Sequence, residues 1–212
     1  MKPGMTWLRL AAVTICAVGI SRAQEHQPAT FGVTVVNMSG LRGSVYLIRE
    51  CYALPQFEKL KPSGTLYTTE LNIPPRAFTE GFPGITRRFE WFAIDYKGRF
   101  WIEKPGVYAF DLLSDDGSKL YIDGGLVINN DGLHSPKSEH GIVELDGGLH
   151  QIRVSYFQGP RFDIALVLTV APPGEPSRVF STNEFKPPAD SEAWKLADPA
   201  SGDPPAEKHR KH

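Results

Sequence analysis

The chain has 212 residues, 41% hydrophobic and 22% charged, a composition typical of a globular protein and incompatible with a wholly disordered or collagen-like chain. Lys and Arg total 23 against 24 for Asp and Glu, so no basic excess indicates a nucleic-acid partner. Two cysteines are too few for a disulfide-stapled scaffold or a four-thiolate zinc site.

Residues 1–23 have the pattern of a secretory signal peptide. Lys2 and Arg9 give a positively charged start, and an apolar run of 11 residues follows at 10–20. That run is too short to span a bilayer, and the tripeptide Ser-Arg-Ala at 21–23 has the small-x-small form that signal peptidase cleaves. We expect cleavage there, giving a secreted, periplasmic or cell-surface protein with no membrane span after signal removal.

Residues 31–170 consist of short runs rich in β-branched and aromatic residues, separated by Gly, Pro, Asn and Asp. Apolar residues at helical spacing are missing from this range. The pattern predicts an all-β domain, either a β-sandwich or a barrel. The expected strands are FGVTVV, GSVYLI, GTLYTT, ITRRFEWFAI, GRFWI, GVYAFDLL, SKLYI, LVIN, GIVEL, HQIRVSYF and FDIALVLTV.

Alternation within three of these runs predicts which side chains face the core. In 106–113 they are Tyr108, Phe110 and Leu112. In 150–157 they are Ile152, Val154 and Tyr156, with Gln151, Arg153 and Ser155 toward solvent. In the last run they are Phe162, Ile164, Leu166, Leu168 and Val170, and because its other face is also apolar, we expect a central strand.

Two proline-rich regions interrupt or follow the strands. The segment LNIPPRAFTEGFPG (71–84) predicts an ordered loop that wraps the sheet edge and offers a second candidate surface. Residues 171–212 predict a Pro-rich linker or disordered tail. Within it, 178–185 is expected to lie back along the sandwich, and 191–197 to form a turn of helix around Trp194.

The densest cluster of distinctive residues is SDDGSKLYIDGG (114–125), followed by INNDGLH (128–134). Asp115 and Asp116 come where a strand ends, and two adjacent carboxylates repel each other unless they are solvated, hydrogen-bonded or bound to a cation. Calcium takes oxygen ligands of this kind. From spacing alone, the cluster is either a solvated β-turn, in which Gly117 takes positive φ, or part of a calcium site.

Several common catalytic and metal motifs are absent from the sequence. An EF-hand is excluded because its first ligand position would fall on Leu112 or Val127. The sequence has no G-x-S-x-G, H-E-x-x-H or C-x-x-C motif and no Gly-rich phosphate loop. His134, His140 and His150 have no fixed metal-ligand spacing.

Two long stretches together are distinctive: GRFWIEKPGVYAFDLLSDDGSKLYIDGGLVINNDGLH (98–134) and GIVELDGGLHQIRVSYFQ (141–158). They resemble the protective-antigen-type (PA-fourteen) β-sandwich domain, which recurs in bacterial toxins, in glycosidase inserts and in flocculin adhesins. The residues that carry the resemblance are Gly106, Tyr108, Phe110, Ser114 to Ser118, Leu120, Ile122, Asp123, Gly124, Leu145, Gly148, His150, Ile152, Val154 and Tyr156.

The resemblance implies an antiparallel β-sandwich with jelly-roll-like topology, and it also implies a candidate site. In lectin members of this family, an Asp-Asp pair joined by a cis peptide holds a calcium ion that also coordinates sugar hydroxyls. The matching positions are Asp115 and Asp116. Those lectins add an asparagine from a later loop, where this sequence has Phe157, Gln158 and Gly159 instead.

Three functional hypotheses follow. The first is a secreted, non-catalytic carbohydrate-binding or adhesion module that recognises a glycan or cell-surface polysaccharide, with calcium as possible cofactor. The second is a structural or protein–protein interaction domain with no sugar or metal site, and the third is a small secreted hydrolase. For the first, we expect metal ligation by Asp115 and Asp116, and sugar contacts from Asn129, Asn130, Asp131, His134 and Gln158.

Overall fold

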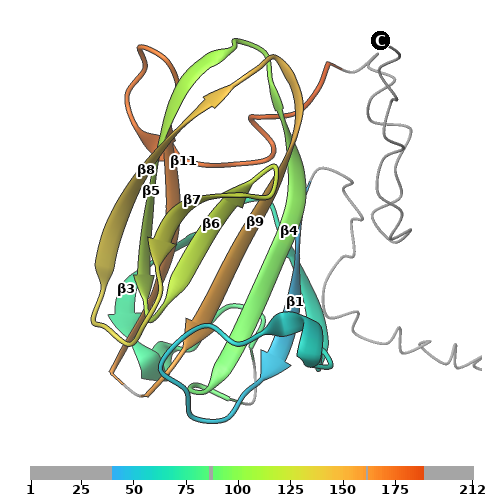
Figure 1. Cartoon of the computed structure of the whole chain (residues 1–212). Coiled ribbons are helices and arrows are strands. Elements are labelled where there is room, and N and C mark those ends of the chain that lie inside the picture. Colours follow the sequence, from blue (N-terminus) through green and yellow to red (C-terminus); the bar gives the residue numbers. More distant parts are fainter. Residues whose placement is uncertain (1–39, 86–87, 161, 189–212) are drawn as a thin grey trace, which may run out of the picture. The chain divides into compact units, whose positions relative to one another are not determined.

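A computed structural model describes residues 40–85, 88–160 and 162–188 (Figure 1). The predicted signal peptide, the predicted strand at 31–36 and the predicted turn around Trp194 lie outside these residues. The described strands are β1 (Leu41–Leu47), β2 (Gly64–Thr68), β3 (Asn72–Ala77), β4 (Phe92–Ile102), β5 (Gly106–Asp115), β6 (Ser118–Ile122), β7 (Gly125–Asn130), β8 (Lys137–Leu145), β9 (Gly148–Gln158), β10 (Asp163–Ala171) and β11 (Arg178–Val179). Two short 3₁₀ turns are η1 (Phe57–Lys59) and η2 (Phe78–Glu80).

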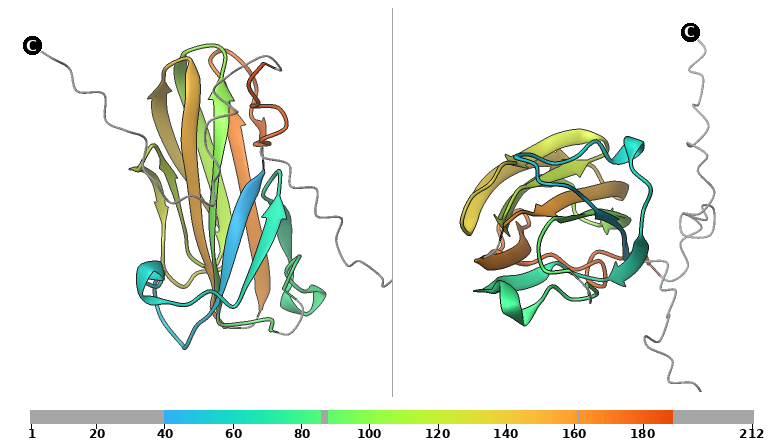
Figure 2. Two further views of the ribbon diagram at one scale, coloured as in Figure 1. Left: turned by 90° about the vertical axis from the view of Figure 1, so that its right-hand side faces the viewer. Right: turned by 90° about the horizontal axis from the view of Figure 1, so that it is seen from below.

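The described strands form two antiparallel sheets, which confirms the predicted β-sandwich. The six-stranded sheet has the order β2-β1-β4-β9-β6-β7, and the five-stranded sheet consists of β11-β10-β5-β8 with β3 also paired to β10. The two layers are seen in side view in Figure 2. β7 lies beside β8 and joins the sheets along one side. Among the described residues, no helix is long and apolar enough to cross a membrane.

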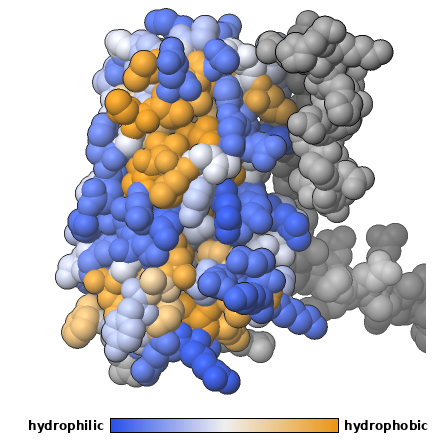
Figure 3. All heavy atoms as spheres, viewed as in Figure 1, coloured by the Kyte–Doolittle hydropathy of each residue, from blue (hydrophilic) through white to orange (hydrophobic). Residues whose placement is uncertain are grey.

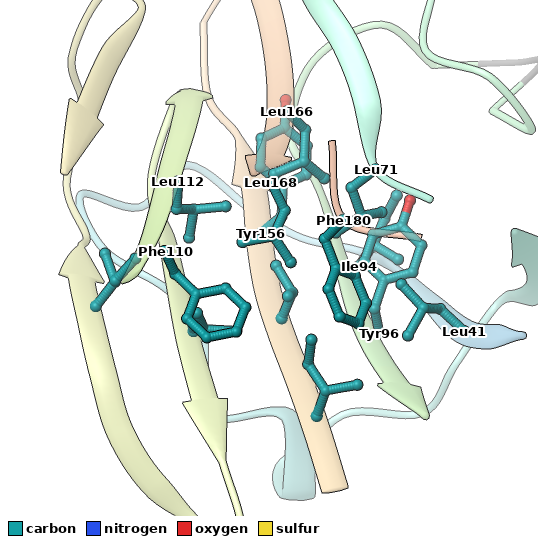
Figure 4. Close-up of a cluster of buried hydrophobic side chains, with 14 of the residues drawn as sticks. Leu41, Leu71, Ile94, Tyr96, Phe110, Leu112, Tyr156, Leu166, Leu168 and Phe180 are labelled. Atoms are coloured by element: carbon teal, nitrogen blue, oxygen red, sulfur yellow. The ribbon is translucent and has the colours of Figure 1, made fainter. Parts of the chain in front are cut away.

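The core lies between the sheets and is built from the inward faces of the longer strands. Figure 4 shows side chains of β4, β5, β9 and β10 meeting there, including Ile94, Phe110, Leu112 and Tyr156. The predicted inward residues of β5 and β9 are all buried, since alternate residues of a strand share one face. β10 lies between β5 and the edge strands β3 and β11, so its predicted central position is confirmed.

Three predictions about strand residues are wrong. Ser155 is buried, and the hydrogen bond that its hydroxyl donates to Asp95 Oδ1 at 2.9 Å compensates for the loss of solvent. Phe162 is 82% exposed, because it lies in the turn before β10 rather than in the strand. β4 begins at Phe92 instead of Ile85, after Trp91, whose φ of 57° interrupts the extended backbone.

The loop predicted at 71–84 contains a strand, β3, on the edge of the smaller sheet. Ile164 pairs with Arg76 and Leu166 with Ile73, so Pro74 and Pro75 both lie opposite the single residue Ala165. This two-to-one count is a β-bulge, and an edge position tolerates proline because the missing N–H groups face away from the partner strand. The prolines therefore shape an edge strand rather than exclude one.

Residues 178–185 lie back along the sandwich, as predicted, and contribute to the core. β11 pairs with Thr169 and Val170 of β10. Phe180 is fully buried and stacks on Phe185 with ring centroids 5.3 Å apart. This part of the proline-rich region is thus not a linker, because its aromatic side chains close one side of the core.

Candidate functional site

Asp115 and Asp116 lie where the chain crosses from one sheet to the other, between the end of β5 and the start of β6. The crossing is at the lower end of the sandwich in Figure 1, seen from below in Figure 2. The β7–β8 loop and the β9–β10 turn lie at the same end, since His134 and Gly159 both contact Asp116. The Asp115-Asp116 peptide bond is cis, as the family resemblance implied.

The carboxylate of Asp116 is buried and held by N–H groups. The main-chain N–H of His134 donates to Oδ1 at 3.1 Å, and that of Gly159 donates to Oδ2 at 2.7 Å. Gln158 Nε2 lies 3.5 Å from the same Oδ2. These donors orient the carboxylate and leave lone pairs on its oxygens, because two carboxylate oxygens together accept about four bonds.

Position 159 has no room for a side chain. A Cβ there would lie 2.4 Å from Leu133 and 3.0 Å from Asp116 Oδ2. Glycine therefore allows the main-chain N–H to approach the carboxylate closely.

Asp115 is 5% exposed, and the pKa of its carboxyl group is raised. Its burial, followed by the charges of Asp116 and Asp163, raises the pKa of Asp115 to about 7. Burial also raises the pKa of Asp116, partly offset by the N–H donors of Gly159 and His134. Within the described ranges, neither carboxylate forms an ion pair with Lys or Arg. In these parts of the protein the two buried carboxylates thus have no Lys or Arg partner, and the charge interaction with His134 only partly lowers their raised pKa values.

Tyr156 and Gln158 support the pair from inside. The Tyr156 hydroxyl donates to the main-chain oxygen of Asp115 at 2.6 Å and lies 2.5 Å from Gln158 Oε1. Burial, with the nearby aspartates, raises the pKa of Tyr156 well above its usual range, so the hydroxyl stays protonated as a donor. Gln158 Nε2 also donates to the main-chain oxygen of Asp163 at 3.1 Å.

Asn130, predicted as a sugar contact, is buried behind the acid pair. Its Nδ2 group donates to Ser114 Oγ at 3.0 Å and to the main-chain oxygen of Lys137 at 2.9 Å. Its Oδ1 has no hydrogen-bond partner among the described residues. Both Asn130 and Gln158 therefore face protein groups in this structure, and a direct sugar contact by either stays a prediction.

The other three predicted sugar residues lie nearer the surface. Asp131 pairs with Lys119 Nζ at 2.7 Å and accepts the main-chain N–H of Leu54 at 2.8 Å, so it fastens the β1–β2 loop. The exposed Asn129 accepts the N–H of Asp131 at 3.3 Å. The ring nitrogens of His134 lie 2.9 Å and 3.0 Å from two main-chain carbonyl oxygens. Of the three, His134 is the one in hydrogen-bond contact with the acid pair, through its main-chain N–H.

Residues 78–181 match the family model of the PA14 domain, and the match includes the acid pair and all strands from β4 to β11. These residues belong to the PA14 family. The comparison with curated proteins gave no match.

Solved structures share the PA14 fold. The PA14 domain of the antifreeze protein MpAFP has a TM-score of 0.56 and 18% identity, over 68% of this chain and 88% of its own. The PA14 sugar-binding domain of an RTX adhesin has a TM-score of 0.55 and 16% identity, over 68% and 96%. An anti-sigma factor domain-containing protein from Clostridium clariflavum has a TM-score of 0.57 and 19% identity, over 72% of this chain and 48% of its own. The chain thus spans about half the length of that protein.

Two exposed aromatic residues at the acid-pair end of the PA14 domain were not found from the sequence. Tyr52 is 84% exposed in the β1–β2 loop, and Phe162 is 82% exposed in the β9–β10 turn. The loop of Tyr52 lies near the acids, since the charges of Asp131 and Asp116 add to burial in raising the pKa of Cys51. Alternation assigned Phe162 to the core, and no sequence signal places the β1–β2 loop beside the acid pair.

The donor set that the described residues offer at this PA14 site consists of the carboxylate oxygens of Asp115 and Asp116. No group of three or more His, Cys, Asp or Glu side chains that could hold a metal occurs in the described part of the chain. Two carboxylates with carbonyl oxygens and water are hard ligands, which suit calcium better than zinc or another soft metal.

Proposed function

We propose that this PA14 domain is a non-catalytic carbohydrate-binding module of a secreted or cell-surface protein, and that it requires calcium at Asp115 and Asp116. The observation that carries the proposal is the buried pair of carboxylates without a Lys or Arg partner at the loop end of the sandwich. The sugar-binding PA14 domain of the RTX adhesin, which shares the fold, supports the same type of ligand.

The residues present fit a calcium ion. A divalent cation between Asp115 and Asp116 would remove their mutual repulsion and the cost of burying two negative charges. The main-chain N–H groups of Gly159 and His134 fix the orientation of the Asp116 carboxylate. When bound, the ion supplies coordination positions for neighbouring hydroxyl groups of a sugar.

The surrounding side chains take different roles in this proposal. Tyr52 and Phe162 are exposed at the same end and offer flat apolar faces to a sugar ring. Asn129 and His134 are placed at the rim and supply polar contacts. Asn130 and Gln158 act as internal braces, because both are buried against protein groups.

Thermal unfolding with and without calcium tests the metal site. With a dissociation constant of about 10⁻⁴–10⁻³ M, ~10 mM calcium should stabilise the wild type by about 1.4–2.7 kcal/mol relative to chelator. Asp116→Asn should lose this response, because it removes one of the two charges. Asp146→Asn, at an exposed position, is the matched control and should retain it.

Two outcomes would overturn parts of the proposal. A wild type that shows no calcium response excludes the metal site, and an equal response from Asp116→Asn places the site elsewhere. A glycan array of neutral sugars probed with calcium and with chelator then tests the ligand, because binding of a neutral glycan that survives chelation contradicts a calcium-dependent sugar site.

A structural or protein-interaction domain is the second candidate function. It is favoured by the main-chain N–H groups that already bind both oxygens of Asp116 and by the internal position of Gln158. In that case the acid pair closes the end of the sandwich by hydrogen bonds alone, and neither calcium nor a glycan changes its stability.

A further inference from the structure

The outer face of the six-stranded sheet carries three basic residues in one cross-strand row. Arg42 of β1 is in register with Lys97 of β4, and Lys97 is in register with Arg153 of β9. Directly opposed side chains on a sheet lie about 5 Å apart at Cβ, and like charges in such pairs are destabilising. Repulsion among the three charges therefore works against the stability of the fold. In Figure 3 hydrophilic residues form a band across the middle of the molecule, between two apolar groups.

One buried carboxylate partly compensates these charges. Asp95 is 2% exposed, and its oxygens lie 2.6 Å from Arg153 Nε and 3.1 Å from Lys97 Nζ. Arg42 has no ion pair within the described residues. Three cations thus share one anion, so the row itself carries an excess of about two positive charges.

The guanidinium of Arg153 is fixed in place. Its Nε donates to Asp95, and its Cζ atom lies over the rings of Phe57 and Tyr121, 5.7 Å and 5.4 Å from their centroids. Its two terminal nitrogens donate no hydrogen bond to any described residue. The side chain therefore presents a preorganised fork of N–H donors, the geometry that binds a carboxylate in bidentate fashion.

These groups line one groove on the outer face of the sheet. Its lining includes Lys97, Tyr121, Gly124, Gln151 and Arg153. Tyr121 is in register with Arg153 on the next strand, and the Lys97 side chain is 66% exposed. An anionic group at Arg153 would thus have a second cation on one side and an aromatic ring on the other.

We propose that this groove binds the carboxylate of an acidic polysaccharide, with a uronate at Arg153 and Lys97 and its sugar ring against Tyr121. The fork fits a planar carboxylate, and the aromatic ring suits the apolar face of a pyranose. Nucleic acid fits less well, since the chain has a net charge of −1 and affinity for nucleic acid rests on many phosphate contacts. The groove is independent of the acid pair and needs no calcium.

Binding of polygalacturonate oligomers in low salt and chelator tests the proposal, since chelation removes any contribution of the acid pair. The wild type should bind this probe and not a neutral galactan of the same length. Arg153→Lys keeps the charge but loses the fork, so affinity should fall about tenfold. Lys97→Gln should weaken binding about threefold or more. Lys186→Gln, an equal charge change at an exposed position off the row, should have no effect.

The proposal fails if the wild type does not bind the uronate, or if Arg153→Lys, Lys97→Gln and the control bind equally. A single-stranded oligodeoxynucleotide is tested alongside. If it binds more tightly than the uronate and its affinity also falls on Arg153→Lys, the groove binds nucleic acid and the proposed class of ligand is wrong. Because Lys97 and Lys186 are exposed, their variants should fold like the wild type, and matching melting temperatures check this. If the wild type binds the uronate but shows no calcium response, the groove proposal holds and the calcium site is refuted.

Discussion

Two places in this sandwich bury aspartates, and they do so in different ways. Asp95, on the sheet face, has Arg153, Lys97 and the Ser155 hydroxyl as partners. At the loop end, the Asp116 carboxylate accepts main-chain N–H groups, and the pKa values of both Asp115 and Asp116 are raised. A buried carboxylate that has an internal cation is a fixed structural element. One that has hydrogen bonds alone remains responsive to protons and cations from solution.

The largest expected effect that separates the two sites is the pH dependence of the acid pair. The pKa of Asp115 is raised from 3.8 to about 7, so its contribution to stability is full below pH 3.8 and is lost as pH rises through 7. In chelator, Asp115→Asn should match the wild type near pH 4 and exceed its unfolding free energy at pH 8 by at most about 4 kcal/mol. Calcium should reduce that difference.

Urea unfolding of both proteins at several pH values measures this effect. Asp146→Asn serves as the control and should follow the wild type throughout. If the unfolding free energies of Asp115→Asn and the wild type change with pH in parallel, the raised pKa of Asp115 is contradicted. The acid pair would then be no more responsive to pH than Asp95.

A smaller effect is expected when the internal cation of Asp95 is removed. Arg153→Met keeps apolar contact with Phe57 and Tyr121 but leaves the buried carboxylate with Lys97 and Ser155. Because Arg153 is partly exposed, we expect a loss of about 2 kcal/mol, below the 3–5 kcal/mol of a fully buried pair. Adding Asp95→Asn should recover part of this loss in a double-mutant cycle. Strictly additive losses would show that the pair is not coupled.

The smallest effect concerns the hydroxyl group on Asp95. Ser155→Ala removes one hydrogen bond to a carboxylate that keeps both cations, so the loss should be about 1 kcal/mol in the same assay. A loss as large as that of Arg153→Met would mean that hydrogen bonding, rather than charge, stabilises Asp95.

The sequence predicted buried residues correctly where the pattern within a single strand was sufficient. Alternation placed Tyr108, Phe110 and Leu112 correctly, because a strand with one buried face must alternate. The acid pair was also visible, since two adjacent acids at the end of an apolar run are conspicuous. A polar residue that finds an internal partner, such as Ser155, breaks the rule, because alternation does not distinguish solvent from a buried carboxylate.

Features that depend on register between distant strands were not predictable. Arg42, Lys97 and Arg153 are far apart in the chain, and only the pairing of β1, β4 and β9 aligns them. The approach of Tyr52 to the acid pair likewise depends on how Asp131 fastens the β1–β2 loop. Such contacts come from tertiary structure, so they leave no local pattern in the residues.

The bulge at Pro74 and Pro75 also affects how copies of the domain can associate. A free sheet edge offers a row of N–H and C=O groups to which a strand of another molecule can be added, and repeated addition leads to fibrils. Neither proline has an N–H, and the bulge disrupts the regular spacing of β3. Pro74 and Pro75, which made the sequence of β3 resemble a loop, therefore protect one edge of the sandwich from strand-by-strand polymerisation.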